Sequence, residues 1–156
     1  MKRIALAAVL LVSLAGPAWT GWDEGLFAYK QGDYATALKE FRPLAAQGDA
    51  DAQAKLGFIY HIGLDVQQDY AKAVKWYRKA AEQGNVNAQT SLGYMYGKGQ
   101  GVTQDYVQAH LWSNLAAAQD HDAARKNRDA IAKEMTPADI SKAQAMAREW
   151  LENHQE

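Results

Sequence analysis

Two adjacent segments of equal length, residues 50–85 and 86–121, repeat each other without a gap. They agree at fifteen of thirty-six positions, far more than this composition would give by chance. The matched pairs are Ala52/Ala88, Gln53/Gln89, Leu56/Leu92, Gly57/Gly93, Tyr60/Tyr96, Gly63/Gly99, Val66/Val102, Gln68/Gln104, Asp69/Asp105, Tyr70/Tyr106, Ala73/Ala109, Trp76/Trp112, Ala80/Ala116, Ala81/Ala117 and Gln83/Gln119. A fixed period of about 20 to 50 residues is typical of stacked-repeat architectures. The chain is therefore expected to be an array of similar units.

Within each copy, the matched residues predict two helices joined by a turn. Leu56, Gly57 and Tyr60 lie on one helical face, and Gly57 leaves room for a second helix to approach closely. The second half carries small and bulky apolar residues at helical spacing. Asp69 and Asp105 precede these second helices and suit the N-cap position. Glycines are expected in the turns and at the left-handed C-caps, at Gly63, Gly84, Gly99 and Gly101.

The matched residues form a recognisable motif. Each copy reads Ala-Gln-x-x-Leu-Gly-x-x-Tyr, then a glycine turn, then Val-x-Gln-Asp-Tyr-x-x-Ala-x-x-Trp and Ala-Ala-x-Gln. This pattern resembles the Sel1-like repeat, a relative of the tetratricopeptide repeat with a slightly longer turn. The resemblance implies an all-α fold, an α-solenoid of about four antiparallel helix pairs. It also implies that the protein binds other proteins.

Partial units flank the two copies, so residues 19–156 are expected to form a single helical-repeat domain. Residues 22–49 are similar to an ordinary tetratricopeptide repeat and form a diverged N-terminal unit. Their Asp33-Tyr34 lies 36 residues before Asp69-Tyr70, in phase with the later copies. Residues 122–153 are expected to form a C-terminal capping pair of helices, 122–134 and 137–153. Such arrays need a closing unit to cover the exposed end.

The N-terminus has the features of a secretory signal peptide, expected to span residues 1–18. Lys2 and Arg3 precede an apolar stretch, Ile4–Ala15, which is too short to cross a bilayer stably. Cleavage is expected after Ala18 or Thr20. An uncleaved N-terminal helix is the alternative. We therefore expect a periplasmic or secreted protein without a stable membrane anchor.

Composition and spacing argue against catalysis and against cofactors. The chain has no cysteine, and its formal net charge of −1 shows no basic stripe of the kind that binds nucleic acid. Its four histidines have no metal-ligand spacing, and no serine lies in a nucleophile motif. His61 lies near Asp65 and Asp69 and is expected to be solvated or to cap a helix. We expect no catalytic residue, no cofactor and no metal site.

The aromatic residues point to a binding surface. Those that recur at the repeat period are expected to be core residues: Tyr60, Tyr70, Trp76, Tyr96, Tyr106 and Trp112. In the tetratricopeptide relatives the residue after the motif glycine points into a concave groove, and Leu26, Phe58 and Tyr94 hold that place. The alternative is that these side chains simply pack between helices. The expected groove residues are Trp22, Leu26, Tyr29, Phe58, His61, Thr90, Tyr94 and Lys98.

These observations favour an exported module that binds a protein or peptide of the cell envelope through this groove. The chain is expected to be monomeric. One alternative is an envelope hydrolase, since some Sel1-like proteins are linked to penicillin binding or hydrolysis. Those relatives are rich in cysteine, which this chain lacks. The other alternative is a permanent structural adaptor in an envelope or secretion assembly.

Overall fold

The computed structural model describes residues 21–154, so the segment expected to be a signal peptide lies outside the described residues. The described part contains eight helices and no strand, which confirms the all-α fold class. The helices are α1 (Gly21–Gln31), α2 (Tyr34–Ala46), α3 (Ala50–Ile62), α4 (Tyr70–Glu82), α5 (Val86–Lys98), α6 (Tyr106–Ala117), α7 (Asp122–Ala132) and α8 (Pro137–Asn153).

In the two complete copies, the second helices begin and the first helices end where the repeat pattern places a cap. The Asp69 and Asp105 carboxylates accept hydrogen bonds from the backbone N–H groups of Lys72 (2.9 Å) and Gln108 (3.0 Å). Gly63 and Gly99 end α3 and α5 in the left-handed conformation, with φ of 78° and 66°. Most residues avoid this conformation because Cβ clashes with the backbone, so a glycine there ends the helix at little cost.

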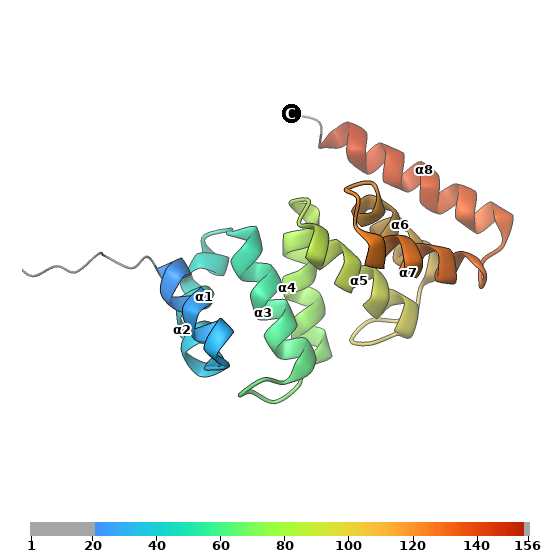
Figure 1. Cartoon of the computed structure of the whole chain (residues 1–156). Coiled ribbons are helices and arrows are strands. Elements are labelled where there is room, and N and C mark those ends of the chain that lie inside the picture. Colours follow the sequence, from blue (N-terminus) through green and yellow to red (C-terminus); the bar gives the residue numbers. More distant parts are fainter. Residues whose placement is uncertain (1–20, 155–156) are drawn as a thin grey trace, which may run out of the picture.

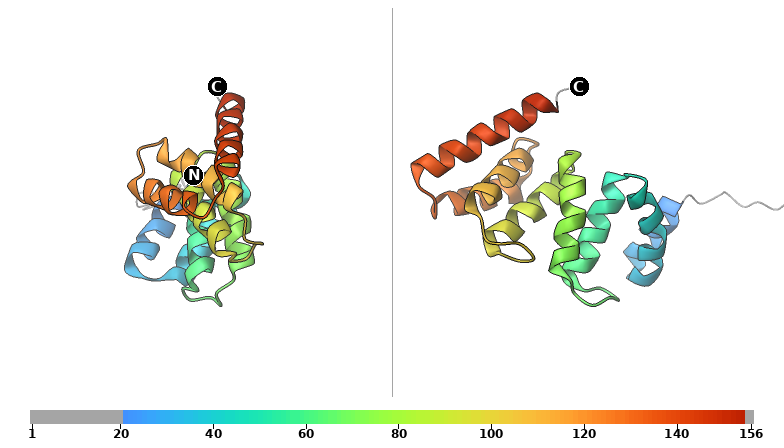
Figure 2. Two further views of the ribbon diagram at one scale, coloured as in Figure 1. Left: turned by 90° about the vertical axis from the view of Figure 1, so that its right-hand side faces the viewer. Right: turned by 180° about the vertical axis from the view of Figure 1, so that it is seen from behind.

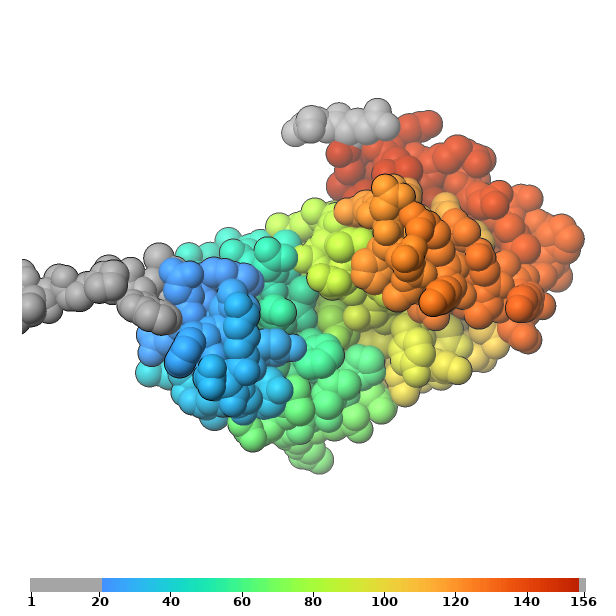
Figure 3. Space-filling view, in the orientation of Figure 1, coloured from blue at the N-terminus to red at the C-terminus, as the bar shows by residue number. Residues whose placement is uncertain are grey.

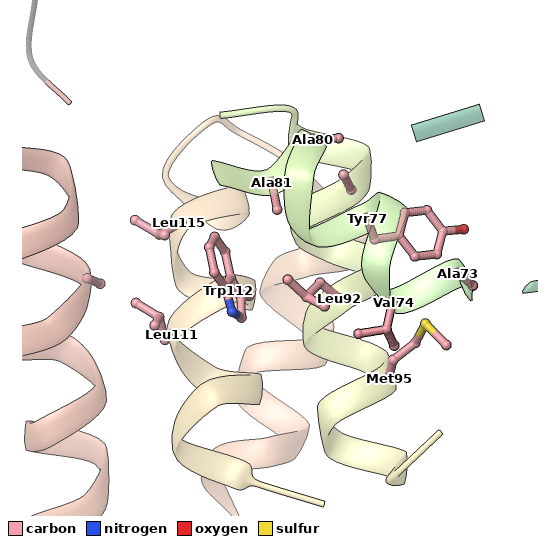
Figure 4. Packing of buried hydrophobic residues seen from close by; sticks show 12 residues of the cluster. Ala73, Val74, Tyr77, Ala80, Ala81, Leu92, Met95, Leu111, Trp112 and Leu115 are labelled. Atoms are coloured by element: carbon pink, nitrogen blue, oxygen red, sulfur yellow. The ribbon is translucent and has the colours of Figure 1, made fainter. Parts of the chain in front are cut away.

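The helices stack in sequence order along the molecule (Figure 1). The pairs α1–α2, α3–α4 and α5–α6 are antiparallel, and each second helix also packs on the first helix of the next pair. The reverse view shows the same stacking, from the blue end to the orange and red end (Figure 2). The buried apolar residues form two main clusters along the array. One lies between α1, α2 and α3, and the other lies between α4, α5 and α6. Figure 4 shows the second cluster, centred on Leu92 and Trp112.

Within each of these three pairs, a glycine of the first helix lies against one residue of the second. A Cβ added to Gly25 would lie 2.8 Å from the Phe41 ring, and one added to Gly57 would lie 2.6 Å from the Tyr77 ring. A Cβ on Gly93 would collide with the Ser113 hydroxyl and lie 3.0 Å from the Ala109 carbonyl. The expected close approach at the motif glycines is therefore present.

The matched glutamines Gln53 and Gln89 are buried, and their hydrogen bonds link one helix pair to the next; these bonds are called the glutamine relay. The Gln53 amide donates to the Ala45 carbonyl (3.0 Å) and accepts from the Gln83 amide (2.9 Å). Gln89 repeats both bonds 36 residues later, with Ala81 (3.2 Å) and Gln119 (2.9 Å). A buried amide is costly without partners, so these bonds explain why the glutamines recur.

The last helix does not pair with α7 as the capping pair was expected to do. It lies chiefly along α6, with Ala143 and Ala147 buried and Trp150 edge-on to Trp112 at 6.5 Å between ring centroids. Figure 1 shows α8 crossing over the end of the array. The reason is that α6 exposes an apolar face that the small residues of α8 can approach closely.

Of the recurring aromatic residues only Trp112 is buried; Tyr60, Tyr70, Trp76 and Tyr96 are partly buried and pack against the core, whereas Tyr106 is partly buried outside the core clusters. Tyr60 and Tyr96 keep their hydroxyls at the surface, where the Arg42 and Arg78 guanidinium groups donate to them at 3.2 and 2.7 Å. The tyrosine ring has an apolar body and a polar tip, so it suits the edge of a thin array better than its centre.

Replacing Gly93 by valine should lower the free energy of unfolding by about 1–3 kcal/mol, because the added atoms meet the α6 backbone and cannot be accommodated by a rotamer change. The matched control is Gly97→Ala in the same helix, where an added Cβ meets only side-chain atoms at 3.7–3.8 Å. Chemical denaturation of both variants gives the comparison. Equal midpoints for Gly93→Val and wild type would rule out the close approach.

Candidate interaction groove

An open groove of about 570 Å³ lies between the first helices of the array. Its walls come from α1, α3 and α5, and His121, just before α7, closes one side. In the space-filling view it lies between the blue N-terminal helix and the orange α7 (Figure 3). Its lining residues are Trp22, Leu26, Tyr29, Asp51, Ala54, Lys55, Phe58, Tyr77, Asn85, Asn87, Thr90, Ser91 and His121.

Five of the expected groove residues meet here: Trp22, Leu26, Tyr29, Phe58 and Thr90. Four of them, Trp22, Leu26, Tyr29 and Phe58, form the apolar half of the groove. The Tyr29 ring lies 6.1 Å from the Phe58 ring and 5.5 Å from that of Tyr34, both edge-on. Phe58 is 39% exposed, which is unusual for an aromatic side chain beside a hollow. This half presents an apolar surface that a ligand side chain can cover.

The other three expected residues lie elsewhere. Tyr94 and Lys98 line a second hollow of about 310 Å³ between α5, the start of α6 and α7. The Lys98 ammonium lies 5.9 Å from the Tyr94 ring centroid. His61 lies between the two hollows, with its ring 6.3 Å from that of Tyr94.

The sequence predicted that His61 would be solvated or would cap a helix. In the structure it is only partly exposed and caps no helix. Its ring is half-buried against the rings of Tyr70 (5.6 Å) and Tyr77 (6.1 Å). Burial lowers the pKa of His61, and the nearby Gln100 side chain opposes part of this shift. The two aspartates are engaged elsewhere, because Asp65 accepts from the Tyr34 backbone N–H and Asp69 caps α4, so the imidazole packs against aromatic rings instead.

Tyr77 lines the groove although it belongs to a second helix. Its ring lies over Gly57, and in Figure 4 its oxygen points away from Leu92 and Trp112. The hydroxyl is buried and has no hydrogen bond of ordinary length, although the Ser91 side chain lies close enough to act as a hydrogen-bonding neighbour. Burial raises the pKa of Tyr77 to about 12, with a smaller contribution from Tyr29, while Ser91 acts in the opposite direction. The sequence signal was present: position 77 is in phase with Phe41, which covers Gly25 in the same way.

The polar half of the groove is built around two helix starts. The Asn85 side chain caps α5 and donates to the Asp51 carboxylate at 2.7 Å. His121 caps α7 by accepting the Ala124 backbone N–H at its Nδ1. The Thr90 hydroxyl donates to the Val86 carbonyl, 2.8 Å away, and lies 3.2 Å from the same Nδ1. Sequence reasoning missed these residues, apart from Thr90, because the two copies differ at each of them.

Lys55 lies at the boundary between the two halves. Its ammonium is 4.5 Å from the centroid of the Tyr29 ring, a cation–π contact. It forms no ion pair within the described chain, although Asp51 lies one turn earlier in α3. The groove therefore offers an apolar surface beside a cation.

The described residues contain no cluster of histidine, aspartate and glutamate side chains that would hold a metal ion. Among the same residues, no helix combines the length and apolar character needed to cross a bilayer. The arrangement is suited to holding a ligand through apolar contact and hydrogen bonds.

The sequence model of the Sel1 repeat matches residues 50–85 and 86–121. The chain is a Sel1-like repeat protein. Proteins of this repeat class typically mediate protein–protein interaction, and their helical solenoids are generally non-catalytic. Sequence comparison with curated proteins gives no match.

Two solved structures carry the same architecture. One is a protective antigen present in uropathogenic Escherichia coli strains, which displays an SLR fold. It shares 33% identity with this Sel1-like protein at a TM-score of 0.79, over 85% of this chain and 29% of that one. The other is a Sel1 repeat protein from Oxalobacter formigenes, with 32% identity and a TM-score of 0.66, over 81% of this chain and 54% of that one. The chain thus spans about a third to a half of these relatives.

The buried hydroxyl of Tyr77 should make stability fall steeply in alkali. The folded chain favours the neutral phenol, with a pKa near 12, whereas the unfolded chain loses this proton near pH 10. The stabilisation is complete below pH 10 and is lost as the pH rises toward 12, on the order of 1–2 kcal/mol. Urea unfolding of wild type and Tyr77→Phe at a series of pH values should show a shallower decline in the variant. At pH 8 the variant should be at least as stable as wild type, because the change removes a buried hydroxyl that lacks a hydrogen bond of ordinary length.

Proposed function

We propose that this Sel1-like protein is exported and binds a peptide segment of a cell-envelope protein in the groove formed by α1, α3 and α5. The observation that carries the proposal is the apolar half of the groove, where partly exposed aromatic side chains gather from two successive repeats. Aromatic residues at the centre of a concave surface are frequent anchors of protein interfaces. The repeat class supplies the coarser expectation of protein–protein interaction.

The shape of the array supports an extended ligand. Each pair contributes one first helix to the groove wall, so a peptide lying across these helices meets Leu26 and Tyr29 first and then Phe58 and Thr90. Stacked helices hold these side chains at set separations, which limits the entropy lost on binding.

Removing the Phe58 ring tests the groove. The Phe58→Ala variant should leave the melting temperature within a few degrees of wild type, because the ring is 39% exposed. Capture of an envelope partner should fall about thirtyfold, which corresponds to about 2 kcal/mol for a central anchor. The measurement is quantitative mass spectrometry of proteins retained from envelope extract by the immobilised chain.

The matched control is Phe27→Ala, which removes an aromatic ring of α1 that is 55% exposed and does not line the groove. It should retain the partner as wild type does. If Phe58→Ala captures the partner as strongly as Phe27→Ala, the groove is not the binding surface.

Export is tested by the mature N-terminus. The positive residues Lys2 and Arg3 before the short apolar stretch motivate cleavage after Ala18 or Thr20. Mass spectrometry of protein from the native host should therefore find a chain that begins at Trp19 or Gly21. A full-length species as the dominant form would contradict cleavage.

A further inference from the structure

We propose that the contact between α6 and α7 is an acid-sensitive latch, in which protonation of His110 releases α7 from the rest of the array. A latch in this sense is a helix contact that holds at neutral pH and opens in mild acid. The inference goes beyond the proposed binding function and does not depend on it, because the opening needs no ligand.

The group that titrates is buried in the third helix pair. His110 of α6 is 2% exposed, and its Nδ1 has no hydrogen bond within the described chain. At the equivalent positions of α2 and α4, spaced by the repeat period, the chain has Leu38 and Val74, and both are buried. Histidine therefore stands at an apolar position of the repeat, and it is the side chain whose ordinary pKa lies in the physiological range.

The surroundings of the imidazole favour its neutral form. The helices α5, α7 and α8 pack against α6, and among the described residues the charged groups that act on His110 are Arg128 and Asp129 of α7. One oxygen of the Asp129 carboxylate already accepts two hydrogen bonds from the Arg128 guanidinium, at 2.8 and 2.9 Å. Burial and the Arg128 charge therefore lower the pKa of His110, and Asp129 opposes only part of this shift.

The direction of the pH effect follows from this shift. When α7 is released, His110 meets water and binds its proton at about pH 6.5, whereas its pKa is lower while α7 is docked. The released state therefore binds more protons in acid, so docking is complete above about pH 6.5 and weakens by up to about tenfold per pH unit below it. A protonated imidazole in the docked state would also leave a buried N–H donor at Nδ1 without an acceptor, which is costly.

The α7 helix is the element that can open. Its buried residues are Ala124 and Ile131, so little apolar surface holds it on the array. Elements with few buried apolar contacts open at the lowest free energy. The N-cap of α7, His121, also lines the groove, so release of α7 would remove one side of the groove wall.

The experiment measures the exposure of α7 with a single introduced thiol, because the chain has no cysteine. Ala124→Cys places the thiol on the buried face of α7, and Ala37→Cys places it at an equally buried position of α2. Each thiol is reacted with dithiodipyridine, a disulfide reagent that remains reactive in acid, and the rate is divided by that of free cysteine at the same pH. The relative rate should rise by up to about tenfold at position 124 between about pH 7.5 and 5.5, and should stay nearly constant at position 37.

Three further variants, made in the Ala124→Cys background, identify the responsible group. His110→Val and His110→Leu supply the side chains of the two equivalent positions, so both should keep α7 docked and remove the pH dependence. His121→Asn is the matched control, because His121 is a second histidine at this contact and accepts the Ala124 backbone N–H at its Nδ1. Asn85 caps α5 through its side chain in the same way, so His121→Asn should keep both the cap and the acid response.

Each other result overturns the proposal. An acid response that persists in both His110→Val and His110→Leu would exclude His110 as its source, and its loss in His121→Asn would assign it to the helix cap. A relative rate at position 124 that does not change with pH would show that the contact does not open. An equal rise at positions 37 and 124 would show that acid opens the whole array and not α7.

Discussion

The close approach of helices at one glycine in each of the first three pairs sets the geometry of this molecule. At Gly57 the absence of a Cβ lets the Tyr77 ring approach the backbone of α3 closely. The ring fills the gap between α3 and α4, and it also lines the groove formed mainly by the first helices. Any larger residue at 57 would separate the two helices and displace this ring, so the packing of the core and the shape of the groove depend on one contact.

The glutamine relay extends that order from one pair to the next. Gln53 and Gln89 are buried, and each joins the carbonyl at the end of the preceding second helix to the glutamine that ends its own pair. Apolar contacts tolerate sliding, whereas a buried amide loses a hydrogen bond if the pairs slip. The relay therefore holds successive first helices in a defined register. This register is what places Phe58 of one repeat and Thr90 of the next on the same groove.

The repeat period was sufficient to predict the helices, the caps and the close contacts, because matched residues report what every unit must satisfy locally. It failed for α8 and for His61, where the outcome depends on contacts between elements far apart in the sequence. It also found only part of the groove. The apolar half follows from the position after each motif glycine, but Tyr77 and Lys55 do not, since neither recurs in the next copy. The position of Tyr77 is Ser113 there, and that of Lys55 is Ser91.

This difference between copies explains how a periodic scaffold acquires one specific site. The groove is lined by equivalent positions of successive repeats, and the residues differ within each pair: Asp51/Asn87, Ala54/Thr90 and Lys55/Ser91 in α3 and α5, and the N-caps Asn85/His121 of α5 and α7. The residues covering the three motif glycines, Phe41, Tyr77 and Ser113, also differ. Of the three, only Tyr77 is among the residues that line the groove. The groove is therefore distinguished from the rest of the array by its side chains and not by its backbone, and this is how one position along a periodic scaffold becomes different from the others.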